Sequence, residues 1–262
     1  MPDILLLDFD GTLTDTEKEA SPALEKWDEL FSERTGMPLN EVKKKIERIK
    51  SKIVSDPKAG WTVNGYVMAP ATADPYVLHT TAYQTLISST AGRIDENILT
   101  GIFHDSYPFS ATVFREGAAN FLDALLQKLS VVIVTNSSTE PVEGKLMKLG
   151  NYPIPVIGNA KKYVPDPASV FLPKYVHLEG FPRPVVLARR HYKEILDGFN
   201  PKETAVMGDI YELDLVVPEF LGFRVVQIAT SNTPSYEIQH HRGRPRNFFA
   251  ASYSDALRHL EK

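Results

Sequence analysis

The stretch Ile-Leu-Leu-Leu-Asp-Phe-Asp-Gly-Thr-Leu-Thr-Asp, from Ile4 to Asp15, decides the fold. Its first four residues form an apolar run without alternation, which is typical of a strand buried on both faces of a parallel sheet. The run ends at Asp8, and Gly11 permits a tight turn shortly afterwards. The stretch therefore places two carboxylates, Asp8 and Asp10, where the carboxyl ends of parallel strands form a crevice.

Two carboxylates one residue apart concentrate negative charge, and this charge needs a cation. With a divalent metal ion present, one carboxylate can act as a nucleophile and its neighbour as an acid or base. Asp-Gly pairs are also common turn formers, so a strand followed by an ordinary turn is the alternative interpretation of Asp10-Gly11.

Two later segments repeat the pattern of an apolar strand that ends in polar residues. The strand predicted from Ser130 ends at Thr135 and Asn136, which together with backbone amides can donate hydrogen bonds to a phosphoryl group. The strand predicted from Thr204 ends at Gly208 and Asp209, and Asp214 follows five residues later. Local turns would be the plain explanation of each segment alone, but their agreement in order favours a shared site.

In this order the segments resemble the signatures of the haloacid dehalogenase superfamily, whose phosphatase branch begins with Asp-x-Asp-Gly-Thr. The resemblance implies a magnesium-dependent phosphatase that hydrolyses a small phosphorylated metabolite through an aspartyl-phosphate. It implies that Asp8 is the nucleophile and Asp10 the acid/base, and that Thr135 and Asn136 bind the phosphate. Magnesium would be bound by Asp8, by the backbone carbonyl of Asp10 and by Asp209, with Asp214 in support.

The sequence departs from the family pattern at the cation that should offset repulsion between a carboxylate and a phosphate. The family places a lysine at the start of the helix before the last signature, and no Lys-Pro pair stands there. We predict Arg190 for this role, because it follows a strand predicted over 184–188 and opens a helix predicted over 191–199. Lys161 and Lys162 remain alternatives, and any of the three could be a surface charge.

The predicted architecture is a Rossmann-like α/β core with a parallel sheet, built from residues 1–15 and 113–262. Residues 16–112 are predicted as a mostly α-helical cap inserted after the first strand. Because the site lies at the carboxyl end of that strand, we expect the cap to exclude water and to select substrates. Within the cap, we predict helices over 40–53, 75–89 and 95–104, and an irregular loop over 55–74.

Two basic segments are expected to lie on the surface of the protein. The lysines and Arg48 of the helix predicted over 40–53 are expected to be a solvated face. Residues 230–247 are expected to form an exposed loop, in which the adjacent His240 and His241 do not make a metal pair. Residues 163–183 are rich in proline and are expected to form an excursion from the core.

Composition limits the possible partners. The 262 residues are 43% hydrophobic and carry a net charge of −4, which favours neither nucleic acid nor an anionic membrane as a partner. The chain has no cysteine, and no apolar run approaches the roughly 20 residues of a membrane span. We expect a cytoplasmic protein, and the sequence predicts no oligomeric state.

Three other functions compete with the phosphatase interpretation. A phosphomutase of the same fold would share every residue named here. A non-catalytic phosphate-binding protein would be expected to lose Asp8 or Asp10, and both are present. A dehalogenase would need neither the second carboxylate nor the metal, so Asp10 and Asp209 argue against it.

Overall fold

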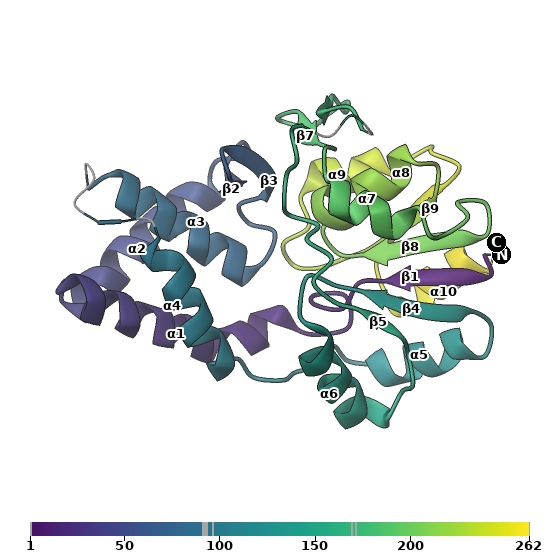
Figure 1. The fold of residues 1–262 in the computed structure, drawn as a ribbon, viewed down its shortest axis with the longest axis horizontal. Helices are drawn as coiled ribbons and strands as arrows, with labels where there is room; N and C mark the ends of the chain where they lie inside the picture. The colour runs from purple at the N-terminus through teal and green to yellow at the C-terminus, as the bar shows by residue number, and fades with distance from the viewer. Residues whose placement is uncertain (1, 91–93, 96, 169, 171, 262) are drawn as a thin grey trace. The chain divides into compact units, whose positions relative to one another are not determined.

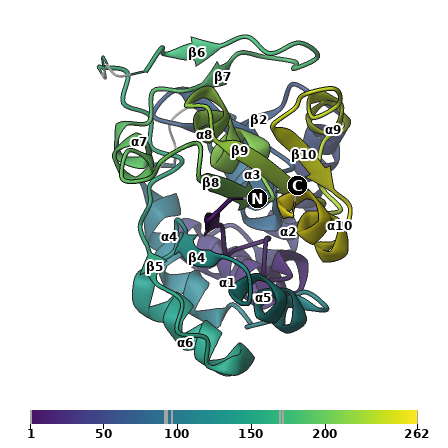
Figure 2. The same ribbon diagram turned by 90° about the vertical axis from the view of Figure 1, so that its right-hand side faces the viewer.

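The apolar run at residues 4–7 forms the strand β1 (Ile4–Leu7) in the interior of a six-stranded sheet in the computed structural model. The strand order is β10-β9-β8-β1-β4-β5, and the strands pair in parallel (Figures 1 and 2). The other strands are β4 (Ser130–Val134), β5 (Val156–Ile157), β8 (Thr204–Gly208), β9 (Arg224–Ile228) and β10 (Asn247–Ala250). The structure describes residues 2–90, 94–95, 97–168, 170 and 172–261.

Helices cover both faces of this sheet, which explains why β1 lacks alternation. Leu5 and Leu7 pack on one face with α5 (Ala118–Leu126), α6 (Thr139–Gly150) and α10 (Tyr253–Leu260). Leu6 packs on the other face with α7 (Arg190–Leu196), α8 (Val216–Phe220) and the π-helical turn η2 (Tyr211–Leu215). This α/β core with a parallel sheet confirms the predicted Rossmann-like fold class.

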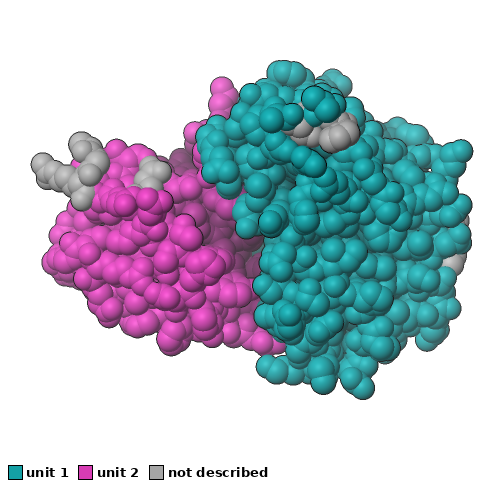
Figure 3. Space-filling view, viewed as in Figure 1, with its two compact units in different colours: residues 1–15, 63–69, 114–262 teal, residues 16–62, 70–113 magenta. Residues whose placement is uncertain are grey.

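The chain divides into two compact units, which Figure 3 colours separately. Unit 1 contains residues 1–15, 63–69 and 114–262, and unit 2 contains residues 16–62 and 70–113. Unit 2 is built from α1 (Thr16–Thr35), α2 (Leu39–Val54), α3 (Pro75–Ser88), α4 (Ile98–Ser106) and the short 3₁₀ helix η1 (Tyr107–Phe109). The helix predicted from residue 95 begins at Ile98 instead, and Glu96 lies outside the described residues.

The irregular loop predicted over 55–74 is wrong. Strands β2 (Gly60–Val63) and β3 (Tyr66–Pro70) form a two-stranded sheet there. Asn64 and Gly65 between them have φ angles of 50° and 78°. Two successive residues with positive φ are typical of a tight hairpin turn, for which Asn-Gly is the preferred pair, so the sequence did contain the signal.

The strand predicted over 184–188 is only partly right. Residues Val185–Val186 form β7, but this strand pairs in antiparallel orientation with β6 (Tyr175–Val176) in a separate two-stranded sheet. It therefore does not end at the carboxyl edge of the main sheet, so the prediction of Arg190 as the cation of the site loses its basis.

The exposed loop predicted over 230–247 is only partly right: residues 242–246 are exposed, but the segment also contains α9 (Ser235–His240) and two buried histidines. His240 Nε2 lies 2.9 Å from the Tyr211 hydroxyl, and His241 Nε2 lies 2.8 Å from Gln227 Oε1. Polar side chains with such partners can be buried at little cost, which explains why a polar stretch lies inside the fold.

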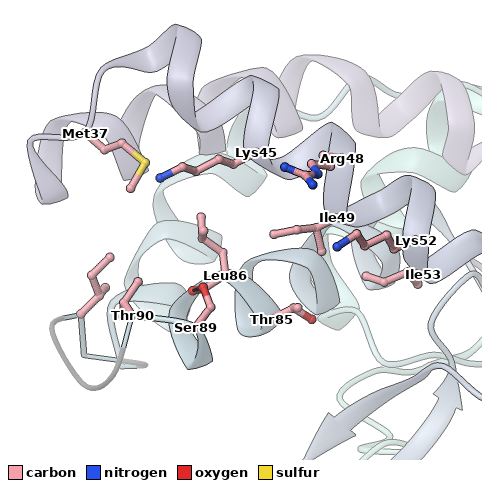
Figure 4. Close-up of a pocket in the computed structure, with 11 residues that line it drawn as sticks. Met37, Lys45, Arg48, Ile49, Lys52, Ile53, Thr85, Leu86, Ser89 and Thr90 are labelled. Carbon is pink, nitrogen blue, oxygen red and sulfur yellow. Dashed lines mark hydrogen bonds between the residues drawn. The ribbon is translucent and has the colours of Figure 1, made fainter.

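A cavity of about 860 Å³ lies within unit 2, between α2 and α3 (Figure 4). Its α2 wall carries Lys45, Arg48 and Lys52, but Lys45 pairs with Glu41 at 2.7 Å and the other two are exposed. None of the predicted site residues lines this cavity. In the part of the chain that the structure describes, no helix is long and apolar enough to cross a membrane.

Candidate active site

Asp8 lies at the carboxyl end of β1 and is buried, with 7% of its surface exposed. Its Oδ1 accepts a hydrogen bond from Lys162 Nζ at 2.7 Å, and its Oδ2 accepts one from the Thr12 hydroxyl at 3.2 Å. Burial raises the pKa of Asp8 to about 7, although the Lys162 ammonium opposes the rise. A further cation beside Asp8 would lower this pKa and favour the carboxylate.

Lys162 is the cation of this site. Its Nζ also donates to Asp214 Oδ1 at 2.9 Å, and the whole residue is 1% exposed. Burial lowers the pKa of Lys162, but the charges of Asp214 and Asp8 outweigh burial and raise it above the usual value. The side chain is therefore a fixed ammonium ion between two carboxylates.

A loop that is tied to the end of β4 holds Lys162 in place. Asn159 N donates to Ser137 O at 2.8 Å, and Ala160 N donates to Thr135 O at 2.9 Å. Lys162 N donates to Asn136 Oδ1 at 2.8 Å. Three backbone amides of the loop that carries Lys162 thus donate to residues 135–137 at the end of β4.

The prediction that Arg190 supplies the cation of the site does not fit this arrangement. Arg190 lies on the surface at the start of α7, where its Nε donates to Glu194 at 2.8 Å and 57% of the side chain is exposed. Its neighbour Arg189 is fully buried, but donates to the Leu213 backbone carbonyl at 2.9 Å. Of the two lysine alternatives, Lys162 lies among the carboxylates.

Asp209 and Asp214 follow β8 and converge on Asp8. One carboxylate oxygen from each of the three residues lies within 4.8 Å of the others. Thr12 Oγ1 lies 3.3 Å from Asp209 Oδ1, so Asp8 and Asp209 flank the same hydroxyl. Asp214 accepts hydrogen bonds on both oxygens, from Lys162 and from Ile210 N at 3.1 Å. The three buried carboxylates lie close enough together to hold a metal ion.

Two glycines make this close approach possible. A Cβ atom added to Gly11, whose φ is +79°, would lie 2.3 Å from Asp209 Oδ2. A Cβ atom added to Gly208 would lie 2.5 Å from the Cβ of Asp214. Both distances are far below van der Waals contact, so the backbone can carry the three carboxylates this closely only with glycine at these positions.

Asp10 faces the end of β4. Its Oδ2 accepts hydrogen bonds from Ser137 Oγ at 2.7 Å and from Thr135 Oγ1 at 3.2 Å, and Lys145 Nζ lies 3.8 Å from its Oδ1. The two predicted phosphate donors thus have protein partners here: Thr135 contacts Asp10, and Asn136 contacts the Lys162 backbone.

Sequence reasoning missed Thr12, Ser137 and Lys145. Thr12 belongs to the quoted Asp-x-Asp-Gly-Thr motif, and Ser137 lies two residues beyond Thr135 at the same strand end. The rule that polar residues gather at carboxyl strand ends could have found both. Lys145 lies inside α6, where a lysine has no signal that separates it from an ordinary surface charge.

A buried amide and a buried acid support Asp209 from behind. Gln227 Nε2 donates to the Asp209 backbone carbonyl at 2.9 Å and to Glu237 Oε2 at 2.6 Å. Burial, with a contribution from the charge of Glu212, raises the pKa of Glu237 to about 8. Glu237 is therefore protonated in the folded protein at neutral pH, and burying it leaves no net charge behind Asp209.

This raised pKa predicts a pH-dependent stability. The folded protein holds the Glu237 proton between the ordinary pKa of 4.5 and about 8, so the free energy of unfolding falls as the pH rises through this range. Glu237→Gln keeps a neutral side chain that can accept the Gln227 hydrogen bond. We expect the free energy of unfolding of Glu237→Gln, measured with urea, to become larger than that of the wild type as the pH rises to about 8. The exposed Glu143→Gln is the control, and parallel pH profiles for Glu237→Gln and wild type would contradict the assignment.

Comparison with solved structures finds the same fold in several proteins. YfnB from Bacillus subtilis, a candidate hydrolase of the haloacid dehalogenase superfamily in a magnesium-bound form, has a TM-score of 0.58 at 16% identity and covers 100% of this chain and 99% of its own. A predicted phosphoglycolate phosphatase from Haemophilus somnus has a TM-score of 0.55 at 17% identity, covering 99% and 98%. A candidate beta-phosphoglucomutase from Thermotoga maritima has a TM-score of 0.54 at 13% identity, with the same coverage.

A search of curated proteins finds no match to the sequence. A family model does match it: the model of haloacid dehalogenase-like hydrolases aligns with residues 2–216. The aligned region begins before β1 and extends past Asp214, so it contains Asp8, Asp10, Lys162, Asp209 and Asp214, whereas Gln227 and Glu237 lie beyond it. This chain belongs to the haloacid dehalogenase-like hydrolase family.

Proposed function

We propose that the protein is a magnesium-dependent phosphatase that hydrolyses a phosphate monoester of a small metabolite through an aspartyl-phosphate. The observation that carries this proposal is the pair of carboxylates on the first loop. Asp8 is buried against the Lys162 ammonium, whereas the Asp10 side chain is 32% exposed and is held by hydroxyl groups. Two carboxylates in such different surroundings suit two different roles, a nucleophile and an acid/base.

The residues present fit a magnesium ion. Asp8 and Asp209 offer carboxylate oxygens, which a hard cation prefers. Asp8, Asp209 and Asp214 would carry three negative charges against the single positive charge of Lys162, so a divalent ion would neutralise the cluster. We propose that Asp8, the Asp10 backbone carbonyl and Asp209 hold the ion, and that Asp214 supports it by orienting Lys162. When bound, magnesium would draw negative charge from the phosphate oxygens.

The reaction follows from the positions of the two acids. Asp8 attacks phosphorus, a bond forms between Asp8 and phosphorus, and the ester bond to the leaving oxygen breaks as Asp10 donates its proton to that oxygen. Asp10 then accepts a proton from water, which attacks phosphorus, releases phosphate and restores Asp8. Lys162 offsets the repulsion between the Asp8 carboxylate and the anionic substrate.

Thr135 and Asn136 remain the proposed phosphate donors. Both lie at the carboxyl end of β4, beside Asp10 and Lys162 respectively. In the proposed reaction, the hydroxyl of Thr135 exchanges its contact with Asp10 for a phosphate oxygen when substrate binds.

Two other functions remain alternatives. A phosphomutase would use the same residues but would transfer the phosphoryl group to a second hydroxyl of the sugar. Incubation with a sugar phosphate separates them, since a phosphatase releases free phosphate and a mutase releases an isomer. A non-catalytic phosphate-binding protein would bind phosphate without turnover.

Replacing the two acids tests the proposed roles. Asp8→Asn removes the nucleophile, and we expect it to abolish hydrolysis of an aryl phosphate. Asp10→Asn removes the base of the second step, so we expect the phosphorylated Asp8 to accumulate and to be detected by mass spectrometry after an acid quench. Asp197→Asn is the control: Asp197 is exposed and its carboxylate pairs with Lys193, so this variant should retain wild-type activity. Full activity in Asp8→Asn would refute the assigned nucleophile.

Two cation variants decide between Lys162 and Arg190. We expect Lys162→Met to lower kcat by about 100-fold or more, since a fixed charge beside the nucleophile is lost. Arg190→Met should stay within about twofold of wild type because its partner is an exposed glutamate. Circular dichroism would show whether each variant is folded. A larger loss of kcat in Arg190→Met than in Lys162→Met would instead assign the role of this cation to Arg190.

Magnesium should stabilise the folded protein. Ligand binding to the folded state alone adds about 2.7 kcal/mol at a concentration 100 times the Kd, so the melting temperature should rise when magnesium replaces a chelator. Asp209→Asn should lose most of this rise, and Asp197→Asn should keep it. An equal rise of the melting temperature in both variants would show that magnesium binds away from Asp209.

A further inference from the structure

Arg115 connects the loop that carries Asp8 and Asp10 with the end of another strand. Its Nη1 donates to the Gly11 carbonyl at 2.9 Å, and its Nη2 donates to the Ala229 carbonyl at 2.6 Å, one residue after β9. The backbone of Arg115 is fixed by a bond from its N to the Leu13 carbonyl at 2.9 Å, next to an antiparallel bridge between Thr14 and Phe114. One guanidinium therefore fixes the spacing of two loops.

Tyr253 binds the next backbone carbonyl of the same loop, that of Thr12. Its hydroxyl donates to the Thr12 carbonyl at 2.7 Å, and the Arg115 guanidinium carbon lies 5.6 Å from the centre of its ring. Phe121 in α5 also supports Tyr253, because the two rings stack with their centres 4.3 Å apart and an interplanar angle of 13°. Arg115 and Tyr253 thus hold two successive carbonyls, those of Gly11 and Thr12.

These carbonyls belong to the turn on which the site depends. Gly11 has a φ of +79° and lies so close to Asp209 that no side chain would fit, and Thr12 reaches Asp8 and Asp209 with its hydroxyl. The Gly11 carbonyl belongs to the peptide that joins Gly11 to Thr12, so a rotation of this peptide would move Thr12 directly and Asp10 through the Gly11 Cα. Displacements of about 1 Å between reacting groups can reduce rates by about 100-fold.

We propose that Arg115 is a positioning residue, which with Tyr253 fixes the Asp10–Thr12 turn in its reactive geometry. This inference rests on the proposed function, because it assigns Asp10 to the chemistry. The Arg115 guanidinium donates to backbone carbonyls, so it acts on the site through the backbone. It should therefore influence the chemical steps more than substrate binding.

The structure supplies a matched control in Arg224, the first residue of β9. Its guanidinium carbon lies 5.8 Å from the centre of the Phe248 ring and its Nη1 donates to the His259 carbonyl at 3.5 Å. Arg224 thus makes the same kinds of contact as Arg115, but at the amino ends of the parallel strands, away from the site. Loss of stability alone should affect both variants alike.

The experiment compares Arg115→Ala, Arg115→Lys and Tyr253→Phe with Arg224→Ala in the full-length protein with magnesium. We expect Arg115→Ala to lower kcat by about 10- to 100-fold with little change in KM, and added guanidinium ion to restore part of the loss. Arg115→Lys keeps the positive charge but loses the rigid spacing of two nitrogen donors, so its kcat should lie between those of Arg115→Ala and the wild type. Tyr253→Phe should lose less kcat than Arg115→Ala, and Arg224→Ala should keep the kcat of the wild type.

Amide hydrogen exchange provides a readout that does not depend on activity. We expect Arg115→Ala to increase exchange in the peptide that covers residues 8–14, and Arg224→Ala to leave that peptide unchanged. An unchanged kcat and unchanged exchange in Arg115→Ala would overturn the positioning role, as would equal losses of kcat in both arginine variants. If the wild type hydrolyses no phosphate ester, the proposed function fails, and the exchange of residues 8–14 still decides whether Arg115 fixes the turn.

Discussion

The site depends on one buried ammonium ion between two carboxylates. Lys162 is 1% exposed and donates to both Asp8 and Asp214 at less than 3 Å. Without it, neighbouring buried carboxylates would repel one another and would hold protons instead of charge. An ion pair of this kind contributes little net stability, because desolvation costs about as much as attraction returns. Its effect is to oppose the rise that burial causes in the pKa of Asp8.

The topology of the sheet explains how residues 154 positions apart meet. Lys162 follows β5 at one edge, Asp8 follows β1 and Asp214 follows β8, in the order β8-β1-β4-β5. The lysine must therefore reach across β4, and its loop does so by hydrogen bonding to residues 135–137 at the end of that strand. The parallel arrangement brings all these ends to one edge, so short loops suffice to build the cluster.

The sequence predicts the site residues that directly follow strands. A continuous apolar run that ends in an acidic residue is a pattern that can be recognised from neighbouring residues alone. Asp8, Asp10 and Asp209 could be located in this way. The place of Lys162 is not encoded locally: the loop before it has φ angles of 52° at Asn159 and 49° at Lys161, and its course is set by contacts with a distant strand end. The buried His240 and His241 were missed for a similar reason, since their partners Tyr211 and Gln227 are far away in sequence.

The loops that carry the acids are also held through their backbone. Three side chains from different elements each donate to a carbonyl in these loops: Arg115 to Gly11, Tyr253 to Thr12 and Gln227 to Asp209. A carbonyl fixed by a donor fixes the plane of its peptide, and so the direction of the side chains on either side. Glycines at 11 and 208 remove the Cβ atoms that would keep the loops apart, but they also make the backbone freer. The outer donors offset this freedom, which explains why flexible glycines and fixed carboxylates can occur in the same turn.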